Sequence, residues 1–208
     1  EEQDKKRSKI IDNVYEKIAT KLQNSYKELY SYSDRVKNIN DLVDMISNEN
    51  QENLHIAITG DLGVGKIEFA QKIGEALFNA GKIEEEKPIV DRLANFTYHR
   101  VAAEDGQERR YYYSVEYRKN DEKCLYILTD IDEFINDYKV HMEEHSLGSY
   151  NETKRKQFKY TIELLTNMFY NNYFIIVGNE KDVKDFLELS TKINYKVNCF
   201  IILCVKKE

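Results

Sequence analysis

The chain has 208 residues, enough for one α/β domain with a helical extension. Hydrophobic residues make up 41% and charged residues 33%, a balance typical of a globular protein. A formal net charge of −6 argues against bulk attraction to nucleic acid or anionic membranes, and no segment reaches the roughly 20 apolar residues that span a bilayer.

The first segment, 1–50, is predicted to form a helical extension. It lacks glycine and proline, and apolar residues recur in it at helical spacing: Ile10, Ile11, Val14, Ile18 and Leu22. A second apolar set, from Ile39 to Ile46, indicates a shorter helix before a polar loop at 47–53. These helices either pack on the domain that follows or form an arm for a partner or a second copy.

From residue 51 to 208 the pattern is that of an α/β domain. Helical stretches separate four short apolar runs of β-prone residues, at 54–59, 125–129, 173–177 and 199–205. This alternation predicts a three-layer αβα sandwich, a P-loop NTPase fold with a mostly parallel five-stranded sheet. The fifth strand is expected within 89–117, where Ile89-Val90 and the tyrosine-rich run 110–117 both qualify.

The most specific motif is a phosphate-binding loop that matches G-x-x-x-x-G-K. It follows the first apolar run and precedes an amphipathic helix predicted over 66–80, with Gly81 as its C-cap. Glycines let backbone N–H groups converge on phosphate oxygens, the helix dipole favours anions, and Lys66 reaches the outer phosphates. The alternative is a tight turn with a chance lysine. We expect ATP or ADP to bind here through Gly60, Asp61, Leu62, Gly63, Val64, Gly65, Lys66 and Ile67.

The residue after the lysine departs from the motif. Ser or Thr at this position helps to hold Mg²⁺ through its hydroxyl, whereas the chain has Ile67 followed by Glu68. Nucleotide can still bind through the backbone and Lys66, but we expect Mg²⁺ binding to be weakened and hydrolysis to suffer.

Polar residues at two other strand ends are candidates for catalysis. Asp130 follows run 125–129 and fits the carboxylate that positions Mg²⁺, although Ile131 stands where a catalytic glutamate is usual. In another register Asp132 and Glu133 form the acidic pair, but Asp130 would then lie inside an apolar strand. Glu133 is thus either catalytic or a solvated helix-start residue. Asn179, after run 173–177, either orients water or belongs to a Gly-Asn turn.

Taken together, these motifs resemble those of AAA+ ATPases. Gly60–Lys66, Leu125–Asp130 and Phe174–Asn179 come in the order and approximate spacing of Walker A, Walker B and sensor 1. The loop and the helix end 74–78 are similar to those of the CbxX/CfqX type, which includes stage V sporulation protein K. The resemblance covers roughly residues 36–205. It implies a five-stranded sheet in the order 5-1-4-3-2, ATP at the subunit interfaces of a ring, and remodelling of a client protein.

The chain departs from that family at several positions besides Ile67 and Ile131. The stretch 191–196, where an arginine finger would lie, contains no arginine, and the sequence ends at Glu208 without a helical lid. These departures favour a degenerate nucleotide-binding domain, weak or inactive in hydrolysis, that works with a protein client or with partner AAA+ subunits as a homo- or hetero-oligomer. Two alternatives stay open: an active ring subunit completed by a partner chain, and an interaction scaffold that binds no nucleotide.

The cysteines and the N-terminus favour a cytoplasmic location. Cys124, Cys199 and Cys204 lie in apolar contexts without metal-ligand spacing, which predicts buried free thiols in a reducing compartment. The charged residues 1–7 are not followed by the apolar stretch of a signal peptide.

Overall fold

The computed structural model describes residues 2, 4–6, 8, 9, 12, 27–31, 39–48, 54–96, 98–100, 111–113, 123–143 and 149–205. The apolar positions predicted to form the first helix, from Ile10 to Leu22, lie outside this part. The strands are β1 (Lys27–Ser31), β2 (His55–Gly60), β3 (Ile89–Arg92), β4 (Tyr98–Arg100), β5 (Tyr111–Tyr113), β6 (Leu125–Thr129), β7 (Tyr173–Gly178) and β8 (Cys199–Val205). The helices are α2 (Ile39–Ser47), α3 (Lys66–Asn79), the 3₁₀ turn η1 (Leu93–Phe96), α4 (Ile131–Glu143), α5 (Ser149–Asn171), α6 (Glu180–Glu188) and α7 (Thr191–Lys196).

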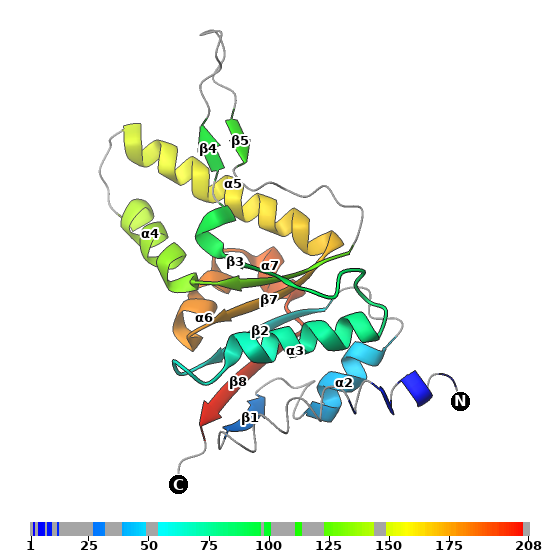
Figure 1. Ribbon diagram of the computed structural model, residues 1–208. Helices are drawn as coiled ribbons and strands as arrows, with labels where there is room; N and C mark the ends of the chain where they lie inside the picture. The colour runs from blue at the N-terminus through cyan, green and yellow to red at the C-terminus, as the bar shows by residue number, and fades with distance from the viewer. Residues whose placement is uncertain are drawn as a thin grey trace.

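The main sheet contains five parallel strands in the order β8-β2-β7-β6-β3 (Figure 1). The predicted αβα fold class is therefore confirmed. Numbered along the chain, these strands stand in the order 5-1-4-3-2 that the resemblance implied. The strand that was expected within 89–117 is β3, which follows Pro88. The tyrosine-rich β5 instead pairs with β4 in a separate two-stranded sheet, and β4 contacts α5.

A sixth strand, β1, was not predicted. It pairs antiparallel with β8, with Lys27 opposite Val205 and Ser31 opposite Ile201, inside the segment expected to be a helical extension. The sequence Lys-Glu-Leu-Tyr-Ser carries little apolar alternation, so nothing local marks it as a strand. Its backbone partners come from the other end of the chain, where β8 would otherwise be an open edge.

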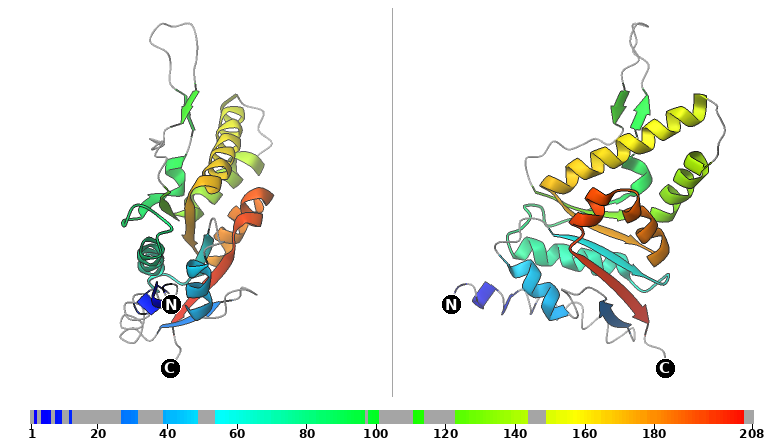
Figure 2. Two further views of the ribbon diagram at one scale, coloured as in Figure 1. Left: turned by 90° about the vertical axis from the view of Figure 1, so that its right-hand side faces the viewer. Right: turned by 180° about the vertical axis from the view of Figure 1, so that it is seen from behind.

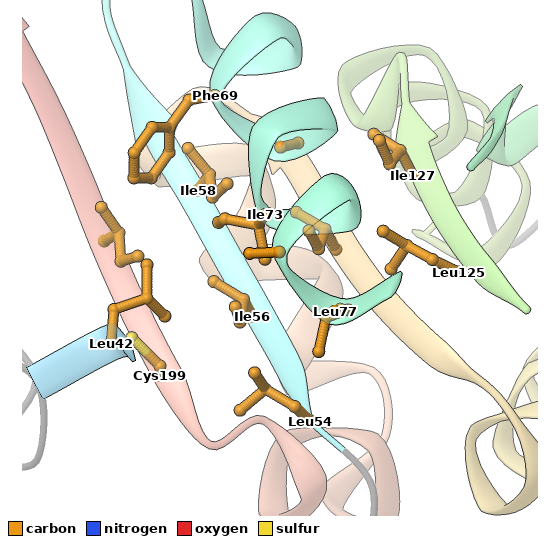
Figure 3. Close-up of a cluster of buried hydrophobic side chains, with 14 of the residues drawn as sticks. Leu42, Leu54, Ile56, Ile58, Phe69, Ile73, Leu77, Leu125, Ile127 and Cys199 are labelled. Atoms are coloured by element: carbon orange, nitrogen blue, oxygen red, sulfur yellow. The ribbon is translucent and has the colours of Figure 1, made fainter. Parts of the chain in front are cut away.

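Helices cover both faces of the sheet, as the edge-on view in Figure 2 shows. On one face, α2 and α3 bury Leu42, Ile73 and Leu77 against sheet residues such as Ile56 and Ile127 (Figure 3). On the other, α4 to α7 pack against alternate residues of the same strands, which are Ala57, Tyr126, Leu128, Phe174 and Ile176. Because both faces are buried, the central strands are continuously apolar rather than alternating.

Helix α3 ends one residue earlier than predicted, and its C-cap is not Gly81. Ala80 is the C-cap, and Gly81 follows with φ of 68°. The N–H of Gly81 donates to the carbonyl of Phe78, and the N–H of Lys82 to that of Leu77, both at 2.9 Å. These two bonds form a Schellman motif, in which glycine takes the left-handed position.

Two cysteines, Cys124 and Cys199, are buried thiols outside any disulfide, and burial raises the pKa of Cys199 to about 12. The Cys204 side chain lies outside the described residues. In the part of the chain that the structure describes, none of the helices has both the length and the apolarity to cross a membrane.

Candidate functional site

The predicted site residues lie along one edge of the main sheet. The five parallel strands run the same way, so their carboxyl ends share that edge (Figure 1). Thr59 of β2 is in register with Gly178 of β7, and Arg92 of β3 with Thr129 of β6. Because β7 lies between β2 and β6, Asn179 follows the strand between the phosphate loop and Asp130.

The backbone favours glycine at three positions of the phosphate loop. Gly60 has φ of 141°, and a Cβ there would lie 2.1 Å from the carbonyl oxygen of Leu203 in β8. Gly63 and Gly65 both have φ of 79°. Between them, the side chain of Val64 is buried in the core. The loop is thus fixed by packing at one residue and by left-handed backbone on either side of it.

Helix α3 begins with backbone donors that no carbonyl of the helix accepts. Its N-cap is Gly65, which has no side chain to accept a hydrogen bond, and the first intrahelical bond runs from the N–H of Phe69 to the carbonyl of Gly65 at 3.0 Å. The N–H groups of Lys66, Ile67 and Glu68 precede that bond and have no acceptor within the helix. Such a helix start favours an anion by its orphan donors and its dipole together.

Lys66 holds its ammonium over the loop. Its Nζ donates to the carbonyl oxygens of Gly60 at 2.8 Å and Asp61 at 2.7 Å. Partial burial lowers the pKa of Lys66, and the nearby charge of Asp61 opposes that shift. Since carbonyl oxygens are neutral acceptors, the ammonium keeps its positive charge at the mouth of the loop.

Three other residues of the predicted nucleotide-binding set face solvent. Asp61 and Leu62 at the tip of the loop are exposed, and the first-turn residue Ile67 is 39% exposed. Ile67 therefore neither builds the core nor offers an oxygen to a ligand.

A second group of residues, here called the acidic corner, comprises Asp130, Glu133 and Arg92. Asp130 directly follows β6 in a left-handed conformation, φ 52°, and Glu133 lies in the first turn of α4. The Nε of Arg92 donates to Oδ2 of Asp130 at 2.9 Å, and its Nη2 donates to the carboxylate of Glu133. Both carboxylates raise the pKa of Arg92, and Glu133 makes the larger contribution. Asp132 is exposed on the same turn.

Asn179 is the N-cap of α6. Its Oδ1 accepts from the backbone N–H of Asp182 at 2.8 Å, and its Nδ2 donates to the Asp182 carboxylate. Both ends of the amide are therefore engaged within the helix start. The water-orienting role proposed for Asn179 stays a prediction.

Sequence reasoning did not identify Arg92. It lies two residues beyond the Ile89-Val90 pair that marked the strand, and its partners are 38 and 41 residues further along the chain. An arginine directly after a short apolar run was the available signal, but only the sheet order reveals which carboxylates it meets.

A cavity lies elsewhere in the molecule. It has a volume of about 520 Å³ and lies between α4 and α5, with Tyr138, Met142, Phe158, Ile162 and Leu189 among its lining residues. No predicted site residue lines it.

Comparison with known proteins adds no further assignment. The chain matches no protein-family model, and a search of curated proteins found no similar sequence. The AAA+ resemblance remains a prediction that rests on the three strand-end motifs.

Proposed function

We propose that this chain is an AAA+-like P-loop domain that binds ATP or ADP, hydrolyses it weakly or not at all, and acts in protein assembly or remodelling. The observation that carries the proposal is the loop Gly60–Lys66. Its glycines hold positive φ, the helix after it starts without a side-chain cap, and the Lys66 ammonium rests on neutral carbonyls. A polyphosphate matches this combination of donors and positive charge.

Weak or absent hydrolysis follows from residues around the loop. Ile131, where a catalytic glutamate would be expected, is fully buried in the core and has no group that could polarise water. The carboxylates of Asp130 and Glu133 share the guanidinium of Arg92. Arg92 therefore occupies one oxygen of each carboxylate while that contact persists.

A binding domain without fast turnover would act through the conformation that nucleotide stabilises. A ligand that binds only the folded state, or only one assembly, shifts the equilibrium towards it by mass action. We propose a protein client or partner subunits as the responding molecules, since the net charge of −6 disfavours nucleic acid. The buried thiols of Cys124 and Cys199, which form no disulfide, suit the cytoplasm, a reducing compartment.

The proposal is tested by binding of a fluorescent ATP or ADP analogue, followed by anisotropy and competed with unlabelled nucleotide. Lys66→Ala removes the charge at the loop and should weaken binding at least about tenfold. The matched control is Lys72→Ala, which removes an ammonium paired with Glu75 farther along α3. Absence of saturable binding to the unmodified chain, or equal losses in both variants, would overturn the nucleotide proposal.

A further inference from the structure

Arg92 reaches the acidic corner from β3, whereas Asp130 follows β6. It ends β3, the outermost parallel strand, in register with Thr129, so its side chain lies beside the residue that follows β6. The Nε of the guanidinium donates to Asp130, and its Nη2 donates to Glu133. One cation thus joins the two carboxylates that the sequence offered for metal binding and catalysis.

A magnesium ion does not fit this arrangement well. Mg²⁺ requires near-octahedral oxygen ligands at about 2.0–2.1 Å, which in nucleotide sites come from one or two carboxylates, phosphates and water. Here one oxygen of each carboxylate, Oδ2 of Asp130 and Oε2 of Glu133, already accepts from Arg92, and Ile67 supplies no hydroxyl. Over the described residues, no three His, Cys, Asp or Glu side chains are grouped so that they could hold a metal ion.

We propose that the guanidinium of Arg92 is the resident counter-charge of Asp130 and Glu133 and takes the place of a divalent cation at this edge of the sheet. The consequence for nucleotide rests on the proposed function: ATP or ADP binds without requiring Mg²⁺. The phosphates are then neutralised by Lys66 and by the backbone donors of α3 rather than by a metal.

The expected size of the effect follows from exposure. The side chains of Arg92, Asp130 and Glu133 are 53%, 50% and 51% exposed, so water and salt screen their attraction. Arg92 therefore competes with a metal rather than blocking it completely. Removing Arg92 should raise divalent-cation affinity about tenfold, and low ionic strength should enlarge the difference.

The experiment measures Mn²⁺ binding to the full chain without nucleotide, from the loss of the free Mn²⁺ signal in electron paramagnetic resonance. Mn²⁺ accepts the same oxygen ligands as Mg²⁺. Arg92→Gln should gain a Mn²⁺ site that the unmodified chain lacks or binds about tenfold more weakly. The matched control is Arg155→Gln. This change removes the same charge from a side chain of α5 that donates to the carbonyl of His141 in α4. Adding Asp130→Asn to Arg92→Gln should abolish the gain.

Two results would overturn the inference: Mn²⁺ binding as tight in the unmodified chain as in Arg92→Gln, or an equal gain in Arg155→Gln. A parallel nucleotide titration in EDTA or Mg²⁺ separates this inference from the proposed function. If nucleotide binds in Mg²⁺ but not in EDTA, the inference of metal independence is contradicted, whereas the proposed function of nucleotide binding still stands. A Mn²⁺ gain in Arg92→Gln with no nucleotide binding in either buffer supports the role of Arg92 and overturns the proposed function.

Discussion

The phosphate loop and the acidic corner lie on the same edge of the sheet but differ in how their charges are partnered. In the loop, the ammonium of Lys66 contacts two neutral carbonyls and keeps its charge. In the acidic corner, two carboxylates share the guanidinium of Arg92, whose positive charge offsets part of their negative charge. One region is therefore ready for an anion, whereas the other already contains its cation.

The two regions also differ in what holds them in place. The loop depends on backbone conformation and on core packing at Val64, whereas the acidic corner consists of half-exposed side chains. Changes in the loop should therefore alter stability as well as binding. Changes in the acidic corner should alter metal and ligand preference while folding is maintained.

The largest effect is expected at Gly60. An alanine Cβ would lie 2.1 Å from the Leu203 carbonyl oxygen at a φ of 141°, so β8 would have to move. We expect Gly60→Ala to lower the free energy of unfolding by at least about 3 kcal/mol in urea denaturation. Gly63→Ala is the matched control, because its φ is also positive but no atom lies within 4 Å of the new Cβ. It should cost about 1–2 kcal/mol, the penalty for left-handed backbone alone. Equal losses in the two variants would show that the approach to β8 does not constrain the loop.

A second prediction concerns the pH dependence of stability. It arises from His55, which lies at the opposite end of β2 from the phosphate loop. The imidazole is buried beside Phe169 and Phe174, and neither ring nitrogen has a hydrogen-bond partner among the described residues. Burial, and secondarily the charge of Lys196, lowers the pKa of His55 from 6.5 to about 4. The nearby backbone of Phe169 acts on this pKa in the opposite direction, although it forms no hydrogen bond with the imidazole.

The sign of the pH effect follows from that shift. Above pH 6.5 His55 is neutral in both folded and unfolded chains, so its contribution to stability is complete. As the pH falls from 6.5 to 4, the unfolded chain takes up a proton that the folded chain does not, and roughly 3 kcal/mol of stability is lost. Urea denaturation at several pH values measures this loss. In His55→Leu this part of the pH dependence should vanish without loss of stability at pH 7; an unchanged pH profile in that variant would contradict the assignment.

The phosphate loop could be predicted from the sequence because its determinants are local. The short loop between a strand and a helix contains Gly60, Gly65 and Lys66, and each of these positions has a backbone or charge requirement of its own. The α/β fold was equally accessible, since the buried strands appear as continuous apolar runs.

The rest of the site depends on partners that are distant in the sequence. Arg92 and Asp130 are 38 residues apart, and β1 pairs with the opposite end of the chain. No periodicity or propensity specifies such contacts, because each forms only once the sheet order brings two segments together. Asn179 is intermediate: its capping partner Asp182 is three residues away, so an N-cap could have been predicted from the local pattern.

The smallest expected effect concerns Asn179, which follows the strand between the two regions. Its amide caps α6, so Asn179→Ala should cost about 1 kcal/mol of stability. Ser190→Ala is the control, because Ser190 caps α7 by accepting from the Ile193 N–H. Since both ends of the Asn179 amide contact Asp182, we expect nucleotide affinity to stay unchanged in either variant. A fall in affinity for Asn179→Ala alone, measured by the same anisotropy titration, would mean that the amide leaves its cap to meet the ligand, and the site would then extend from the loop across β7 towards the acidic corner.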